Sequence, residues 1–243
     1  MTPGERLELL MRFKGFGNPR NERKICFVGI EEASGFSCLP IRLLDDEVLQ
    51  RYAEEFKIEE EGDYYEYRSQ WNRDNAPKRY TKVYEYMAKI IKNIEPEITE
   101  KDILDNYLFT NNGLAFQFNI YPLGRKNTRE ATIDFTDPNR FDLNSYQHYQ
   151  RIVRERRFPL LLNFWNTNRD NFAITICFGS TYWKDYKMLF DIERNAEIDT
   201  DYFKYFEREN ILLTPFFKSG NGGLNNNLLD EIYELLNNNN IYL

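Results

Sequence analysis

Residues 24–29 read KICFVG, an apolar run of strand length that ends at a glycine. Short apolar runs bounded by glycine or proline are typical of strands buried inside a sheet. Three later stretches share this pattern and are predicted as strands: LAFQFNI at 114–120, FAITICF at 172–178 and ILLT at 211–214.

Helical periodicity fills the intervals between these runs. Apolar residues recur at helical spacing from residue 80, and Pro96 ends that helix. Thr99 and Asp102 form a capping box that opens a short helix. Further helices are predicted at 145–157 and 159–169 (or one helix bent at Pro159), at 180–190, and around 228–235.

Strands that alternate with helices favour a mostly parallel sheet covered on both faces. We therefore predict a three-layer α/β/α fold with a four-stranded, mostly parallel central sheet. The 243 residues are expected to form a single domain, 1–243, with its core at about 24–236.

The charge is unevenly distributed along the chain. Residues 45–66 hold ten acidic and two basic residues, a net −8, which leaves +1 for the rest of a chain whose total is −7. This acidic excursion is predicted to be a solvated segment without chemistry of its own. A DNA-facing surface elsewhere is therefore compatible with the acidic total, although charge alone does not indicate one.

Cysteine content and hydropathy bear on the compartment. The three cysteines are odd in number and lack metal-ligand spacing. No segment approaches the ~20 apolar residues that cross a bilayer. A cytoplasmic protein that does not enter membranes, acts as a monomer and needs no metal or cofactor is expected.

Polar residues follow the predicted strands at their carboxyl ends, where α/β sheets bind ligands. Glu31 lies two residues beyond Gly29, and a carboxylate there is costly to desolvate, so it either caps a helix or serves catalysis. Asn119 ends an apolar strand and must find hydrogen-bond partners, either in neighbouring loops or in a ligand.

Taken in order, these segments resemble the uracil-DNA glycosylase superfamily, and most closely its single-strand-selective monofunctional branch. The residues Asn119-Ile120-Tyr121-Pro122-Leu123 are similar to the family's Asn followed by a Pro-Leu turn. Glu31 stands where the family has Asp or Asn. Residues 214–218, TPFFK, stand in place of the family's His-Pro-Ser-Pro and basic loop, so that Thr214 replaces its His. His148, the one histidine in the chain, lies in a predicted helix and is expected to be a surface or packing residue.

The resemblance implies an enzyme that flips a pyrimidine out of single- or double-stranded DNA and hydrolyses its N-glycosidic bond. Glu31 would stabilise the cationic sugar and activate water, with Glu32 as the alternative at this position. Asn119 would hold the flipped base. Phe36 would stack on that base, and Thr214 would donate a hydrogen bond to it.

The same resemblance suggests how DNA would be held. Phe217, or Phe216, would fill the gap left in the duplex together with Lys218, as apolar wedges do when proteins kink DNA. Arg125 and Lys126, with Arg129 nearby, would contact phosphates; scattered surface charges are the alternative interpretation.

The small residues after Glu32 do not distinguish uracil from a larger pyrimidine. Ala33, Ser34 and Gly35 would leave room for a C5 substituent, so uracil and a C5-modified pyrimidine are both candidates. Superfamily members that excise glucosylated hydroxymethylcytosine from phage DNA offer a precedent for the second. Two other classes are a non-catalytic nucleic-acid-binding module of the same fold and a hydrolase of free nucleosides or nucleotides.

Overall fold

The chain forms two compact units that interleave along the sequence. The first comprises residues 1–15, 29–64 and 119–167, and the second comprises 16–28, 65–118 and 168–243. The computed structural model describes residues 2–12, 14–20, 23–30, 82–110, 112–122, 125–127, 130–131, 143–217 and 226–243.

A six-stranded sheet forms the centre of the second unit, in the order β2-β1-β5-β8-β7-β6. The four predicted strands are confirmed with nearly the predicted bounds: β1 (Lys24–Gly29), β2 (Ala115–Asn119), β5 (Phe172–Phe178) and β8 (Ile211–Thr214). The prediction of four strands was nevertheless wrong, because β6 (Ile198–Asp199) and β7 (Lys204–Phe206) extend the sheet beyond β8.

The first four strands in this order run in the same direction. β1 pairs parallel with β5, and β5 pairs parallel with β8. On the other side of β1, the N–H of Ile25 donates to Leu114 O and that of Ile120 donates to Gly29 O, so β2 is also parallel. β7 is antiparallel to both β8 and β6. The sheet is thus mostly parallel. From β1, the next strand in the sequence (β2) lies on one side, and the later strands (β5 and β8) lie on the other.

Burial explains why the long strands could be recognised. Every residue of β1 is buried, and so is every residue of β5 except Ala173. Strands covered on both faces carry continuous apolar runs rather than an alternating pattern. The apolar runs at 24–29 and 172–178 are the direct result.

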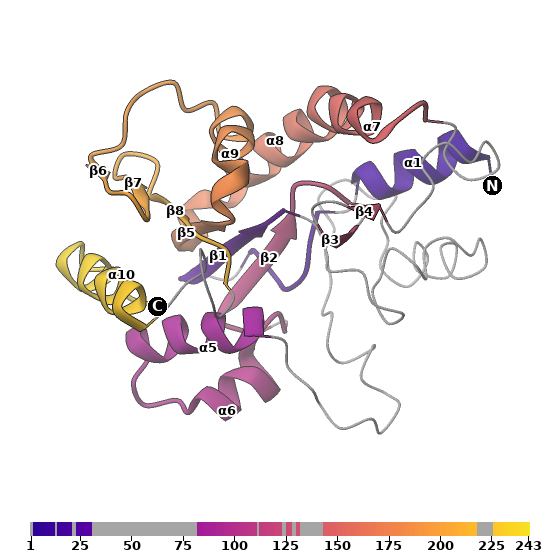
Figure 1. The fold of residues 1–243 in the computed structure, drawn as a ribbon. Coiled ribbons are helices and arrows are strands. Elements are labelled where there is room, and N and C mark those ends of the chain that lie inside the picture. Colours follow the sequence, from indigo (N-terminus) through magenta and orange to yellow (C-terminus); the bar gives the residue numbers. More distant parts are fainter. Residues whose placement is uncertain are drawn as a thin grey trace. The chain divides into compact units, whose positions relative to one another are not determined.

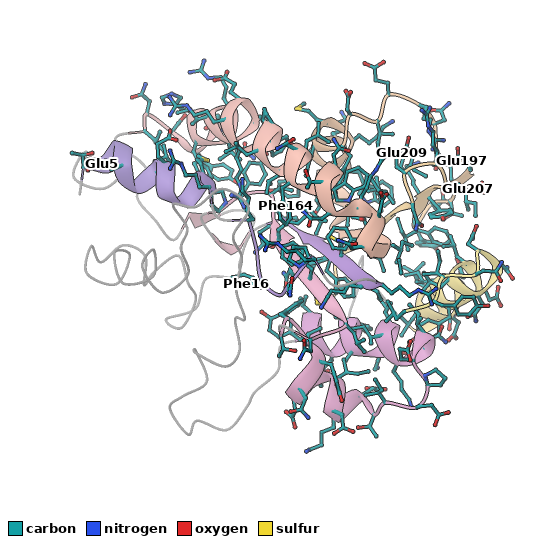
Figure 2. All side chains as sticks on the ribbon, turned by 180° about the vertical axis from the view of Figure 1, so that it is seen from behind. Glu5, Phe16, Phe164, Glu197, Glu207 and Glu209 are labelled. Atoms are coloured by element: carbon teal, nitrogen blue, oxygen red, sulfur yellow. The ribbon has the colours of Figure 1, made fainter. Side chains whose placement is uncertain are left out.

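The two added strands carry no long apolar run, and polar side chains form contacts next to them. Arg194 hydrogen-bonds to both Glu197 and Glu209, and its guanidinium lies 5.7 Å from the ring centroid of Phe206. Glu197 also accepts a hydrogen bond of 3.0 Å from the N–H of Glu207. Figure 2 shows these three glutamates gathered at the same part of the second unit. Strands of two and three residues are too short to show a period in the sequence.

The outer edge of β2 is covered by the segment before β1. Phe16 and Gln117 form an antiparallel bridge with N···O distances of 2.7 and 3.0 Å. Gly17 has φ 94°, and a Cβ there would lie 2.7 Å from Ala115 O, so the close approach needs glycine. Covering an edge strand in this way prevents it from pairing with another chain.

Helices of the second unit follow the predicted periodicity. α5 (Lys82–Ile94) turns its apolar face inward and packs against α10 (Asn226–Asn238). α6 (Glu100–Asp102) begins at Thr99, whose hydroxyl accepts from Asp102 N at 3.1 Å and confirms the capping box. α9 (Trp183–Leu189) lies on the other side of the strands from α5 (Figure 1).

In the first unit, a long helical segment combines three elements. α7 (Tyr146–Ile152) leads into a π-helix, η2 (Val153–Arg157), and then into α8 (Phe158–Asn168). The N–H of Phe158 donates to Val153 O, five residues back. Pro159 has no N–H, so it cannot donate a hydrogen bond to the carbonyl four residues earlier. This missing α-helical bond explains why the helix widens just before Pro159.

Two further elements of the first unit were not predicted. They are α1 (Pro3–Arg12) and the hairpin of β3 (Arg125–Asn127) with β4 (Glu130–Ala131). Among the described helices of both units, none has the length and apolar character needed to span a membrane.

Candidate functional site

The ends of β1 and β2 lie side by side within the first unit. Beyond Asn119, the chain continues along the end of β1, with Ile120 N donating to Gly29 O at 3.0 Å and Tyr121 N donating to Ile30 O at 2.8 Å. Glu31 follows Ile30 directly in the sequence. The main chain of residues 29–30, just before Glu31 in the sequence, is therefore joined to that of residues 120–121, just after Asn119.

Asn119 is held from its backbone, and its side chain is half-buried. Its carbonyl accepts a hydrogen bond of 2.8 Å from Arg157 Nη2. The same guanidinium donates through Nε to Ile120 O at 3.2 Å and through Nη1 to Met11 O at 2.8 Å. Arg157 is 1% exposed, so these carbonyls replace water as acceptors for its donors.

Tyr121, which follows Asn119 and Ile120, is anchored by packing. Tyr121 is fully buried, and its ring centroid lies 6.1 Å from that of Tyr149 and 6.2 Å from that of Phe158. These aromatic contacts and the hydrogen bonds to Arg157 hold residues 119–121 from two sides. The segment is thus a rigid support for any ligand-binding role of Asn119.

Thr214 ends β8 in the second unit and is fully buried. Its hydroxyl donates to Pro215 O at 3.1 Å and lies 3.4 Å from Cys177 O. Its own carbonyl accepts from Gly179 N at 2.9 Å and from Trp183 Nε1 at 3.2 Å. A role in donating to a base would require the hydroxyl to leave these main-chain acceptors.

Phe217, predicted to contact DNA, lies instead in the core of the second unit. It is fully buried and stacks on Phe178 with 4.8 Å between ring centroids and 16° between planes. Phe27 meets it edge-on at 6.2 Å. A ring held in this way is a packing residue. Phe216 is half-buried, 5.8 Å from Phe178 between centroids, and is the more accessible of the two.

Several predicted site residues lie outside the described part of the chain: Glu31, Glu32, Phe36 and Lys218. The backbone of Arg125 and Lys126 forms β3, but their side chains are outside the description. His148 lies near the start of α7, where its Nδ1 accepts from Asn144 N at 3.3 Å, as suits a packing role.

The described cysteines and acids show no metal-binding arrangement. Cys26 and Cys177 are fully buried, and burial raises the pKa of both thiols well above the usual range. Within the described residues, no group of three or more His, Cys, Asp or Glu side chains could hold a metal ion.

Sequence reasoning missed Arg157. It lies in the charged run RIVRERR at residues 151–157, where several arginines look equivalent. In the structure Arg157 is buried, whereas Arg156 is exposed. No pattern of charge or hydropathy in one sequence identifies it.

Comparison with known proteins identifies no relative. The chain matches no protein-family model, no curated protein and no solved structure.

Proposed function

We propose that the protein is a monofunctional DNA glycosylase with a three-layer, uracil-DNA glycosylase-like fold. It would flip a pyrimidine, either uracil or a C5-modified base, out of DNA and hydrolyse the bond between the base and C1′ of the sugar. Water adds to C1′, and the base leaves with the electron pair of the broken bond. An abasic site remains in the DNA.

One observation carries this proposal: the hydrogen bonds that join Ile120 to Gly29 and Tyr121 to Ile30. They place the end of β2 beside the residue that precedes Glu31. Glu31 follows Ile30 directly in the sequence. The proposal therefore pairs its carboxylate with the amide of Asn119, as the resemblance to uracil-DNA glycosylases implies.

In this proposal, the carboxylate of Glu31 stabilises the positive charge that develops on the sugar and accepts a proton from the attacking water. The amide of Asn119 binds the edge of the flipped base and donates to it as negative charge builds up there. Glu32 is the alternative acid, and Phe36 is the proposed stacking partner of the base.

A second candidate is a non-cleaving module that binds an extruded base or a single strand. The hydroxyl of Thr214 favours it, because its hydrogen bond to Pro215 O engages the donor that would assist departure of the base. The binding role of Asn119 is the same in both candidates.

The decisive experiment incubates the protein with oligonucleotides that carry uracil, hydroxymethyluracil, hydroxymethylcytosine or glucosylated hydroxymethylcytosine. Alkali then cleaves the DNA wherever an abasic site has formed. We expect the wild type to act on one of these bases, and both Glu31→Gln and Asn119→Ala to lower the rate by about 10²-fold or more.

Matched controls separate loss of chemistry from general damage. Glu97→Gln and Asn106→Ala make the same changes at exposed positions and should leave the rate unchanged. Binding to the oligonucleotides without cleavage supports the non-cleaving module instead. Full activity in Glu31→Gln and Asn119→Ala refutes the assigned site.

A further inference from the structure

Arg157 occupies an unusual place for a charged side chain. It is 1% exposed, and its three nitrogens donate to three main-chain carbonyls, those of Met11, Asn119 and Ile120. All four residues belong to the first unit. Burying a guanidinium costs free energy unless its donors are hydrogen-bonded. Its rigid fork of N–H groups can bind several acceptors at once.

The helix is distorted at the point that presents this side chain. Arg157 is the last residue of the π-helix η2, whose widened turn interrupts the segment between α7 and α8. Arg156, one position earlier, points to the surface and pairs with Glu8 at 2.5 Å. π-helical turns cost stability and occur frequently at functional sites. Pro159 accounts for the widened turn, and the observation that leads to the end of β2 is the buried guanidinium at the last residue of that turn.

We propose that Arg157 is a positioning residue for Asn119. The inference rests on the proposed function, in which the Asn119 amide binds the departing base. The guanidinium fixes the carbonyls of Asn119 and Ile120, while the N–H groups of Ile120 and Tyr121 are fixed by Gly29 and Ile30. The backbone that carries the amide is therefore held from both edges before a ligand arrives.

Preorganisation of this kind acts mainly on the chemical step. A displacement of about 1 Å in a positioned group can lower a rate by roughly 10²-fold. The amide can still bind the base after such a displacement, but it no longer aligns with the charge that develops in the transition state. We thus expect loss of Arg157 to lower kcat far more than it raises KM.

A double-mutant cycle tests whether Arg157 acts through Asn119. The rate of base release is measured for wild type, Arg157→Lys, Asn119→Ala and the double variant. Lysine keeps the charge, but its single nitrogen cannot reproduce the fork of donors. In the wild-type background, Arg157→Lys should lower kcat by about 10²-fold with KM changed by less than about threefold. In the Asn119→Ala background, the same change should cost less than about threefold.

Arg157→Met and Arg156→Met complete the design. Arg157→Met removes all the donors and should lose at least as much activity as Arg157→Lys. Arg156→Met removes an exposed arginine from the same turn and should leave kcat and KM unchanged. Thermal unfolding of each variant is recorded alongside the rates.

The outcomes separate the inference from the proposed function. If the wild type releases no base from any oligonucleotide, the proposed function fails and the inference fails with it. If the wild type is active but the losses from Arg157→Lys and Asn119→Ala multiply, Arg157 does not act through Asn119 and only the inference is overturned. It is also overturned if neither Arg157 variant folds, because the residue then serves the fold itself.

Discussion

Phe217 packs against rings from three elements of the second unit. Its face lies on Phe178 of β5, its edge meets Phe27 of β1, and its centroid is 6.2 Å from that of Tyr86 in α5. In the sequence it directly precedes Lys218, and the family resemblance suggested that the two act as a DNA wedge. Its position between sheet and helix shows a contribution to stability instead.

We predict that Phe217→Ala lowers the free energy of unfolding by about 3–5 kcal/mol, because it removes a fully buried ring and leaves a cavity. Urea denaturation monitored by circular dichroism measures this change. Phe216→Ala, at the half-buried neighbour, should cost clearly less. A small effect of Phe217→Ala on stability together with a large loss of DNA affinity would restore the wedge interpretation.

At the scale of elements, β1 is buried from end to end and includes a lysine at its first position. Lys24 is 1% exposed, and its ammonium donates to Gly113 O. Burial lowers the pKa of this ammonium to about 8, since the charged form is poorly solvated there. The folded state thus binds the proton of Lys24 less tightly than the unfolded chain does.

The sign of the pH dependence follows from this pKa. Between pH 8 and the higher pKa of a lysine in the unfolded chain, the unfolded state binds more protons, so Lys24 makes stability increase as the pH rises through this window. We predict that the unfolding free energy of Lys24→Met, relative to wild type, falls by about 3 kcal/mol from pH 7 to 10.5. Urea titrations across this range measure it, with Lys184→Met at an exposed position as the control for loss of one charge. A difference that stays constant with pH would contradict the lowered pKa.

The helical segment from α7 to α8 illustrates how an element can carry a site without a sequence signal. Periodicity predicted helix on both sides of Pro159, and the structure confirms it. At the π-helical turn between the two parts, Arg157 contacts Asn119 while the neighbouring Arg156 pairs with Glu8. Helical periodicity alone did not single out Arg157.

For the whole molecule, charge is the main constraint on the proposed partner. The net charge of −7 disfavours DNA binding. The residues outside 45–66 carry a net charge of +1, so a DNA-binding surface would lie there. The proposed phosphate contacts of Arg125 and Lys126 follow the Asn119 motif directly in the chain. Binding should then depend strongly on salt, because each phosphate contact releases counterions.

We predict that Arg125→Gln reduces the slope of log K against log salt by about 0.7–0.9, the contribution of one phosphate contact. Fluorescence anisotropy with a labelled oligonucleotide between low and moderate salt measures the slope. Lys184→Gln, on an exposed position of α9, should leave the slope unchanged. Equal slopes for wild type and Arg125→Gln would remove this residue from the proposed interface.

The sequence by itself determined the four long strands and most helices of this protein. β1, β5 and β8 begin and end at the predicted residues, since strands buried on both faces carry mostly apolar runs. The second strand was predicted over 114–120, one residue longer at each end than β2 (Ala115–Asn119).

Only the tertiary structure decided the rest. β6 and β7 join the sheet through antiparallel pairing next to β8, and Phe217 lies in the core among rings from three separate elements. Arg157 reaches the end of β2 across nearly forty residues of chain. Contacts between residues this far apart depend on how the whole chain packs. Local sequence patterns therefore cannot predict them.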